Sequence, residues 1–357
     1  MLVEYYFPES LSAARLDRYL AGGWFRSGPS LFRTRLLCLD GGVFSVVNVR
    51  VPLQQYTYSR SLRRNFKRNT ALFRYEIGPA YVDEQQEALY RAHKHRFKGF
   101  VFDTLEEYLF SGMPRLIFDT WEVRVYDGDK LIATSYFDRG QQAVASLLGL
   151  FDHDYRQHSL GLFTMLVELE AAQSMGMRYY YPGYVLQGHG GFDYKLRLGS
   201  IEYYNWSGRW RPWDKLHEQP SVTQLLEMRM AAAEEALRET GVAFIRCLYP
   251  YFSLGYLSFT RENYLRSAMY LRCYPTPAGG SYGQLLLEYL QEDECYQLCW
   301  VEQEVNPQLD DQAYSETEYR SDTYTVDFLI YRDVILRHPS PQVIARRAAA
   351  LAQHIIR

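Results

Sequence analysis

A cluster of basic side chains in segment 59–69 (SRSLRRNFKRN) is the first candidate binding feature of this sequence. Its basic residues, too dense for a core element, are Arg60, Arg63, Arg64, Lys67 and Arg68. In a helix, Arg60, Arg64 and Lys67 would share one face. Such a face can neutralise the phosphates of a polyanion, which makes binding depend on salt. The alternative is an ordinary solvated helix whose charges face water.

The start of a second helix, predicted from Ser159 to about Met175, is the other such feature. Ser159 is placed to cap this helix and Gly176 to end it. The first N–H groups of a helix have no partner inside it, and together with the helix dipole they attract a phosphate or carbonyl oxygen. We therefore expect an oxygen-rich group of a ligand to bind at Ser159, Leu160 and Gly161.

The cysteines do not form a recognisable metal-binding pattern. They stand at positions 38, 247, 273, 295 and 299, with no CxxC pair and no nearby His-x3-His arrangement, so we expect reduced thiols and no metal. Cys295 and Cys299 would share one face of a helix, but their surroundings are rich in strand formers, and a strand would separate them.

The elements around the second helix predict the fold. Two helices come first, followed by a hairpin that turns at Asp127-Gly128-Asp129, a buried strand, the helix itself and an aromatic strand. This is the element order of the GNAT acyltransferase fold, in which the helix N-terminus meets the acyl donor, and it predicts the α+β class. The predicted ranges are 83–98 and 103–111 for the two helices, 117–126 and 131–138 for the hairpin, 143–151 for the buried strand and 178–184 for the last strand.

The flanking sequence suggests two further modules. A short helix at 11–20 ends at Gly22-Gly23, and a hairpin at 35–51 turns at Asp40-Gly41-Gly42. From residue 219 onward we expect a helix, a strand, a helix at 261–271, further strands and a closing helix at 340–356. The predicted domains are an N-terminal basic module at 1–80, a GNAT-like acyltransferase domain at 81–214 and an additional α+β module of unknown role at 215–357.

Charge is unevenly spread although the net charge is only −3. Residues 1–70 hold eleven Lys or Arg and four Asp or Glu, whereas residues 288–322 hold eleven acidic residues and one Arg. The basic end is a candidate polyanion surface, and the acidic segment is expected to be a solvated connection. The sequence shows neither a signal-peptide pattern nor a stretch approaching eighteen apolar residues, so we expect a cytoplasmic protein that does not enter a membrane.

Segment 151–188 (FDHDYRQHSLGLFTMLVELEAAQSMGMRYYYPGYVLQG) resembles the arginyl-tRNA protein transferases and the bacterial enzymes that transfer leucine to acidic N-termini. Motifs on both sides fit the same family, so the resemblance covers about residues 20–214. These motifs are GWFRSG at 23–28, SRSLRR at 59–64, Asp193-Tyr194-Lys195, Glu202 and the Trp206 to Trp210 region.

The resemblance implies that a peptide α-amine attacks an aminoacyl ester on tRNA and releases the tRNA 3′ hydroxyl. The partners are then aminoacyl-tRNA and a protein or peptide N-terminus that begins with an acidic residue, with no DNA involved. Ser159, Leu160, Gly161 and Tyr181 become candidates for binding the donor, and the five basic residues of segment 59–69 for binding tRNA. Arg26 and Lys195 become candidates for reading the acidic acceptor. The candidates for proton transfer are Asp193, Glu170 and His158, although Glu170 can equally be a solvent-facing carboxylate.

Two alternative functions remain open. The family carries paired N-terminal cysteines that bind a metal or cluster, whereas here the first pair is absent and Cys38 stands alone near the second, so no such cofactor is expected. This leaves a catalytically inactive binding module as one alternative. The other is a coenzyme A-dependent N-acyltransferase of the same fold, although the loop from Arg156 to Phe163 supplies only Gly161 and misses the usual pyrophosphate-binding spacing.

Overall fold

The computed structural model describes residues 1–97, 101–111, 117–260, 262–274, 283–304, 323–325 and 327–356. The chain divides into two compact units. Unit 1 comprises Met1–Glu4, Thr34–Ser45 and Pro220–Arg357, and unit 2 comprises Tyr5–Arg33 and Val46–Gln219. The expected boundary at 80 therefore needs correction, because most of the first 80 residues belong to the same unit as the predicted acyltransferase domain. Unit 2 ends at Gln219, near the expected boundary at 214.

Unit 2 is built on a large mixed sheet in the order β12-β11-β5-β10-β9-β8-β7-β6. Its strands are β5 (Gly42–Pro52), β6 (Arg74–Pro79), β7 (Thr120–Asp127), β8 (Lys130–Arg139), β9 (Ala143–Phe151), β10 (Tyr179–Gln187), β11 (Glu202–Tyr204) and β12 (Trp210–Pro212). The long strand β5 lies between β10 and β11, which is why the N-terminal segment is not a separate module.

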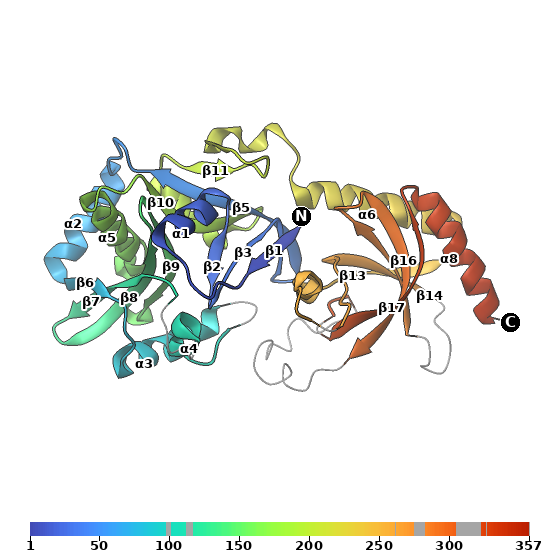
Figure 1. Ribbon diagram of the computed structural model, residues 1–357, viewed down its shortest axis with the longest axis horizontal. Coiled ribbons are helices and arrows are strands. Elements are labelled where there is room, and N and C mark those ends of the chain that lie inside the picture. The colour runs from blue at the N-terminus through green and yellow to red at the C-terminus, as the bar shows by residue number, and fades with distance from the viewer. Residues whose placement is uncertain are drawn as a thin grey trace. The chain divides into compact units, whose positions relative to one another are not determined.

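The helices of unit 2 are α1 (Ala13–Ala21), α2 (Arg60–Leu72), α3 (Glu84–His93), α4 (Leu105–Phe110) and α5 (Leu160–Ser174). Helix α5 packs against β8, β9 and β10 and also contacts α2, so its side chains are buried almost all round. Figure 1 shows α2 and α5 as neighbouring helices beside this sheet. Short 3₁₀ turns connect the elements: η1 (Lys94–Arg96), η2 (His153–His158), η3 (Gly190–Leu198) and η4 (Trp213–Glu218).

The predicted element order is confirmed. The hairpin β7–β8 pairs Asp127 with Lys130 across the turn, where Gly128 has a φ of +59°. Strands β8 and β9 are antiparallel, and β10 returns beside β9 in parallel after α5, as a strand–helix–strand crossover requires. The core of this unit lies between the sheet and α5 and includes Phe163, Leu166 and Tyr180.

The N-terminal part of unit 2 contributes a small hairpin. Strands β2 (Phe25–Ser27) and β3 (Ser30–Thr34) pair around a turn at Gly28, which has a φ of +55°. Strand β1 (Val3–Tyr6) spans the boundary between the two units, and the hairpin predicted at 35–51 is confirmed as β4 (Leu36–Leu39) and β5. In the turn of that hairpin, Asp40 and Gly41 both have a positive φ.

Unit 1 contains an antiparallel sheet in the order β13-β14-β15-β16-β17, with α6 (Val222–Glu239) and α8 (Pro341–Ile356) packed against it and against each other (Figure 1). Its strands are β13 (Ala243–Leu248), β14 (Met269–Tyr274), β15 (Gln284–Leu290), β16 (Cys295–Glu304) and β17 (Phe328–His338), with a 3₁₀ turn η5 (Pro250–Tyr256). Among the described residues, no helix is long and apolar enough to cross a membrane.

Two expectations for unit 1 are wrong. The helix predicted at 261–271 is absent from its described part, because residues from Met269 onward form β14, where their apolar side chains pack within the sheet. The acidic segment 288–322 begins inside the sheet, since Glu288 is a fully buried residue of β15. The NPQLDDQ part of that segment lies outside the described residues. Cys295 and Cys299 both lie on strand β16, as predicted.

The glycine at position 23 offers a stability test. Gly23 has a φ of +77°, and a Cβ there would lie 2.5 Å from the ring of Tyr204. Gly128 has a φ of +59° but nothing within 4 Å of an added Cβ. We expect Gly128→Ala to lower the free energy of unfolding by about 1–2 kcal/mol through the backbone alone. Gly23→Ala should lower it by about 2–5 kcal/mol, because steric overlap adds to the same backbone cost. Urea unfolding measures both; equal losses would contradict the close packing on Tyr204.

Candidate active site

The point where β9 and β10 separate organises the candidate site. Their parallel pairing runs from Tyr179 opposite Ala143 to Tyr181 opposite Ala145. Pro182 comes next and has no N–H to donate, and Gly183 follows with a φ of +93°. The regular ladder therefore stops at Tyr181. Hollows lie on either side of the separated strands, and both are lined by Ser146 and Leu147 of β9.

The larger hollow, called here the α5 pocket, has a volume of about 440 Å³ and lies entirely in unit 2. The start of α5 forms one wall, with Ser159, Leu160 and Gly161, three residues predicted to bind the donor. The separated part of β9 and residues of η3, including Lys195, form other walls. The structure thus brings the predicted donor-binding turn together with one of the two predicted acceptor-reading cations.

Ser159 does not cap α5 with its side chain, contrary to expectation. Its φ of +53° and ψ of +49° place it in the left-handed region, and its hydroxyl makes no capping hydrogen bond. The first helical bonds are donated by Leu162 and Phe163 to the Ser159 carbonyl. The N–H groups of Leu160 and Gly161 precede these bonds, so the helix start keeps donors available for a ligand oxygen.

The α2 helix holds the start of α5 in place. The carbonyl oxygen of His158 accepts hydrogen bonds from Asn69 Nδ2 at 3.0 Å, Arg68 Nη2 at 2.9 Å and Asn65 Nδ2 at 3.3 Å. Asn65 and Asn69 are buried one helical turn apart on the same face of α2. These two asparagines are positioning residues that sequence reasoning missed, although a pair of amides four residues apart in a basic helix is a readable signal.

Glu168 is the most unusual group in the α5 pocket. Its residue is fully buried on α5, and one carboxylate oxygen accepts a hydrogen bond from the Tyr180 hydroxyl at 2.7 Å. The other oxygen, Oε1, has no hydrogen-bond partner among the described residues. Burial raises the pKa of Glu168 to about 7, while the nearby hydroxyls of Ser135, Tyr180 and Ser146 limit the rise. A carboxyl group with this pKa can accept or release a proton near neutral pH.

Lys195 is the second group in the α5 pocket whose pKa departs from its ordinary value. Its Nζ donates to the carbonyl oxygen of Tyr184 at 3.0 Å and lies 5.2 Å from the ring centre of the same residue. Burial lowers the pKa of Lys195 to about 8, because the apolar surroundings penalise the ammonium form. The glycine at 183 leaves space for it, since a Cβ there would lie 3.3 Å from Nζ. Lys195 can therefore present a positive charge close to the gap between the strands.

Basic side chains dominate the charge of the α5 pocket. Besides Lys195, the lining includes Arg96, Arg156 and Arg197, whereas Glu168 is the one carboxylate among the described lining residues. A pocket with this balance and with a helix N-terminus in its wall favours a ligand that carries negative charge.

The smaller hollow, of about 20 Å³, lies on the other side of the separated strands and contains Arg26 and Tyr181. The side chain of Arg26 is only 5% exposed and forms an ion pair with Asp138 at 2.8 Å, so its charge is already neutralised inside the protein. It also donates to Gly28 O at 2.7 Å and Thr120 Oγ1 at 2.9 Å. These contacts indicate that Arg26 stabilises the fold. Tyr181, which was predicted to bind the donor, lines this smaller hollow and lies outside the α5 pocket.

The residues predicted for proton transfer do not enter the α5 pocket. Asp193 is exposed on η3. Glu170 is exposed on α5, on the side near Tyr58 and Tyr75. This agrees with the alternative interpretation of Glu170 as a solvent-facing carboxylate. The ring of His158 packs edge-on against Phe73, with centroids 5.0 Å apart.

The buried carboxylate of α5 is that of Glu168, two positions before Glu170. The sequence did not show which of the two carboxylates is buried, because the helix is apolar all round and gives no periodicity from which its faces can be read.

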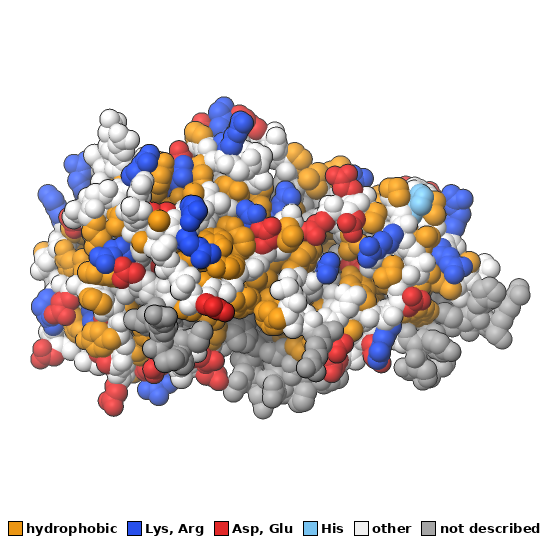
Figure 2. All heavy atoms as spheres, in the orientation of Figure 1, with side chains coloured by type: hydrophobic (Ala, Val, Ile, Leu, Met, Phe, Trp, Pro, Cys, Tyr) orange, Lys and Arg blue, Asp and Glu red, His pale blue; other side chains and the backbone are white. Residues whose placement is uncertain are grey.

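The predicted tRNA-binding residues all lie exposed on α2. Leu62 and Phe66 form the opposite, packed face of this helix, and Phe66 contacts Phe163 of α5 with ring centres 5.8 Å apart. Figure 2 shows Lys and Arg side chains (blue) on the part of the surface where Figure 1 places α2. Two of the five are partly engaged: Arg68 with the His158 carbonyl and Arg63 with the Tyr58 carbonyl.

The described residues contain no group of three or more His, Cys, Asp and Glu side chains arranged to hold a metal ion. Cys38 is buried, and burial raises the pKa of its thiol to about 12, which keeps it protonated.

Part of unit 2 matches a known protein family. Residues 74–205 match a protein family described as arginine-tRNA-protein transferase, C terminus. A relative named aspartate/glutamate leucyltransferase from Leptospira interrogans is 28% identical over 198 residues, which cover 54% of this chain and 76% of the relative. One of the same name from Stenotrophomonas maltophilia (strain K279a) is 28% identical over 203 residues, covering 55% of this chain and 78% of the relative.

Similarity to solved structures is more distant. A GCN5-related N-acetyltransferase from Kribbella flavida has a TM-score of 0.25 and 15% identity, with 42% of this chain and 50% of that chain covered. Another, from Anabaena variabilis, has a TM-score of 0.29 and 10% identity, with 76% and 56% covered. The α+β assignment rests on the observed elements and their order.

The raised pKa of Glu168 predicts a pH-dependent stability. Its pKa of about 7 in the folded protein lies above the ordinary value of 4.5, so ionising the carboxyl opposes folding. Relative to Glu168→Gln, the wild type should lose roughly 3 kcal/mol of unfolding free energy as the pH rises from about 4.5 to 7. Urea unfolding over this range measures the difference. The exposed Glu170→Gln serves as control and should follow the wild type; if Glu168→Gln does so too, the burial argument fails.

Proposed function

Since residues 74–205 match the C-terminal region of the arginine-tRNA-protein transferases, we propose that this chain is an aminoacyl-tRNA protein transferase. It takes an amino acid from a charged tRNA and joins it to the N-terminal amine of a protein or peptide that begins with Asp or Glu. The observation that carries the proposal is Glu168, a buried carboxyl with a pKa of about 7, in a cationic pocket at the start of α5. The relatives named aspartate/glutamate leucyltransferase support the acidic acceptor and the aminoacyl donor.

The donor end of the tRNA occupies the α5 pocket in this proposal. The N–H groups of Leu160 and Gly161 face the carbonyl oxygen of the aminoacyl ester and stabilise the negative charge that develops on it during attack. Arg96, Arg156 and Arg197 are available for the phosphates near the tRNA 3′ end. This arrangement uses the excess of positive charge in the pocket.

Glu168 acts as the general base. A peptide amine is an ammonium ion near neutral pH and must lose a proton before it attacks. The carboxylate form of Glu168 takes that proton, the amine nitrogen bonds to the ester carbonyl carbon, and the bond from this carbon to the tRNA 3′ oxygen breaks. After attack the nitrogen still carries one proton too many, and it passes that proton to the leaving 3′ oxygen. Glu168 releases the proton that it took to solvent, so that it returns to its starting state and a new peptide bond has formed.

Lys195 reads the acidic side chain of the acceptor. Its Nζ lies close to the gap between β9 and β10, and the ammonium form can make a charge-assisted hydrogen bond to an Asp or Glu carboxylate. Asp193, His158, Arg26 and Tyr181 take no part in the transfer step, because none of them lines the α5 pocket. We also propose that this activity modifies protein N-termini in the cytoplasm.

A transfer assay tests the proposal. The wild type should move a radiolabelled amino acid from charged tRNA to a peptide that starts with Asp or Glu, faster as the pH rises through about 7. Glu168→Gln should lower kcat by about 10²–10⁴-fold, the usual contribution of a general base. Glu170→Gln, on the same helix but exposed, should retain wild-type activity.

Failure of the wild type with every aminoacyl-tRNA supplied would contradict the proposal. Calorimetry with acetyl-coenzyme A is the companion experiment: saturable binding, together with acetylation of a peptide amine, would establish the coenzyme A-dependent alternative instead. Loss of transfer in Glu170→Gln equal to that in Glu168→Gln would remove Glu168 from its assigned role.

The exposed face of α2 should bind tRNA. Replacing Arg60, Arg64 and Lys67 together by Gln leaves the internal contacts of Arg63 and Arg68 intact. If each of the three contacts one phosphate, the slope of log K against log salt concentration should become shallower by about 2–3. Filter binding of tRNA at several salt concentrations measures the slope. The paired replacement of Arg346 and Arg347, exposed on α8 of unit 1, is the control. Equal effects of both sets would indicate nonspecific attraction.

A further inference from the structure

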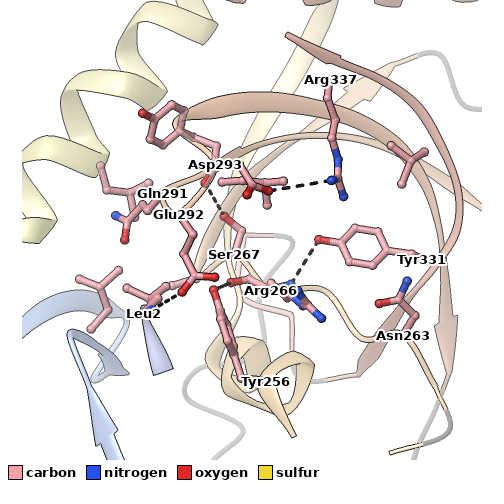
Figure 3. A pocket seen from close by; sticks show the side chains of 16 residues that line it. Leu2, Tyr256, Asn263, Arg266, Ser267, Gln291, Glu292, Asp293, Tyr331 and Arg337 are labelled. Carbon is pink, nitrogen blue, oxygen red and sulfur yellow. Dashed lines mark hydrogen bonds and ion pairs between the residues drawn. The ribbon is translucent and has the colours of Figure 1, made fainter. Parts of the chain in front are cut away.

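Unit 1 contains a cavity of about 190 Å³ that the proposed transfer reaction does not use. All of its lining residues belong to unit 1, and residues 74–205, which match the transferase family, contribute none of them. Its walls come from β15, β17, the segment 263–268 and the turn after β15 (Figure 3). Its lining includes cationic, anionic and apolar side chains, together with neutral polar ones such as Asn263, Ser267 and Gln291.

Arg266 provides the first cation. Its Nε donates to the carbonyl oxygen of Gly255 at 2.7 Å. Gly255 allows this approach because it lacks a side chain: a Cβ there would lie 2.6 Å from Cγ of Arg266 and 2.7 Å from the carbonyl oxygen of Tyr264. The guanidinium is thereby fixed through one nitrogen, and its two terminal nitrogens remain as donors for a ligand.

Arg337 provides the second cation and is fixed in the same manner. Its Nε donates to Gln297 Oε1 at 2.5 Å, and Gln297 Nε2 donates to the buried Glu288 at 2.8 Å. Tyr331 donates its hydroxyl to the same carboxylate oxygen of Glu288. One buried carboxylate thus holds both Arg337 and Tyr331. Figure 3 shows Arg337 and Tyr331 on the same side of the cavity, with Arg266 directed into the space below them.

Glu292 and Asp293 supply the anionic part. Glu292 accepts a hydrogen bond from the N–H of Leu2, and its Oε1 also lies 3.7 Å from the N-terminal ammonium of Met1. Figure 3 places Glu292 and Leu2 on the side away from Tyr331. Asp293 lies 3.9 Å from Arg337, too far for a hydrogen bond, and both side chains are about half exposed. The apolar part of the lining consists of Leu2, Leu36, Leu226, Leu290 and Val334.

We propose that this cavity binds a free aliphatic α-amino acid. The α-carboxylate lies between the guanidinium groups of Arg266 and Arg337, which suit a planar carboxylate. The α-ammonium faces Glu292 and Asp293, and the aliphatic side chain contacts the leucines of the lining. The cationic, anionic and apolar parts of the lining thus match the three parts of one zwitterion, and the cavity volume suits a ligand of this size. This inference does not depend on the transfer reaction.

A phosphate ligand fits the same cavity less well. Two arginines would attract it, but Glu292 and Asp293 among the lining residues would repel its additional charge. In an amino acid the carboxylate would pair with the arginines and the ammonium with the acidic side chains. Neither charge of the ligand would then be repelled.

Calorimetry of the full chain with leucine and its analogues tests the proposal. Leucine should bind saturably. Leucinamide, which lacks the carboxylate, and 4-methylpentanoate, which lacks the ammonium, should each bind at least about tenfold more weakly, as expected for the loss of a charge-assisted contact. Leucine binding in Arg266→Gln should weaken by a similar factor, and Arg266→Lys should be intermediate because it keeps the charge without the fork.

Arg332→Gln is the matched control, because Arg332 lies on the same strand β17 but outside the cavity, where it pairs with Glu302. Its leucine binding should equal that of the wild type. The proposal is overturned if leucine shows no saturable binding, if Arg332→Gln and Arg266→Gln weaken it equally, or if inorganic phosphate binds more tightly than leucine. Gly255→Ala, which displaces Arg266, gives a second test should Arg266→Gln fail to fold, and it should also weaken binding.

Discussion

The arrangement of the α5 pocket depends on one local constraint, the end of the ladder between β9 and β10. A parallel pair that continued past Tyr181 would bring the strands into contact and fill the space with their side chains. Pro182 withholds a donor and Gly183 adopts a positive φ, so the strands separate while the rest of the sheet stays paired. The gap gives Lys195 space beside Gly183 and exposes Ser146 of β9 to both hollows.

The same gap explains why a carboxyl group can be buried on α5. Glu168 enters a sheet-facing position that an apolar residue would otherwise occupy, and Tyr180 on β10 supplies the hydrogen bond that makes its burial tolerable. Because burial penalises the charged form, the carboxyl group is costly to ionise, and its pKa rises into the neutral range. The structure thus sacrifices some stability to hold a group that can exchange protons.

Helix α2 links two features that the sequence showed separately, the basic segment 59–69 and the start of α5. Its buried face, with Asn65 and Asn69, holds the carbonyl of His158 and so fixes the start of α5. Its opposite face presents the basic residues to solvent. A polyanion bound on that exposed face would therefore lie on the helix that positions the proposed donor-binding turn. In unit 1, a comparable arrangement occurs on a smaller scale, where the buried Glu288 holds both Tyr331 and Gln297.

The sequence by itself determined the elements of unit 2 and their order, because hairpin turns, helix ends and strand composition are set by neighbouring residues. The turn at Gly128, the helix ending before Gly176 and the strand β9 were all readable in this way. Only the tertiary structure decided which side chains meet. Whether Glu168 or Glu170 is buried, whether Arg26 is free or paired with Asp138, and which unit receives residues 34–45 all depend on long-range packing. The sequence of a helix that is apolar all round does not show which of its faces packs against the sheet. Only the packing of α5 on the sheet therefore shows which carboxylate is buried.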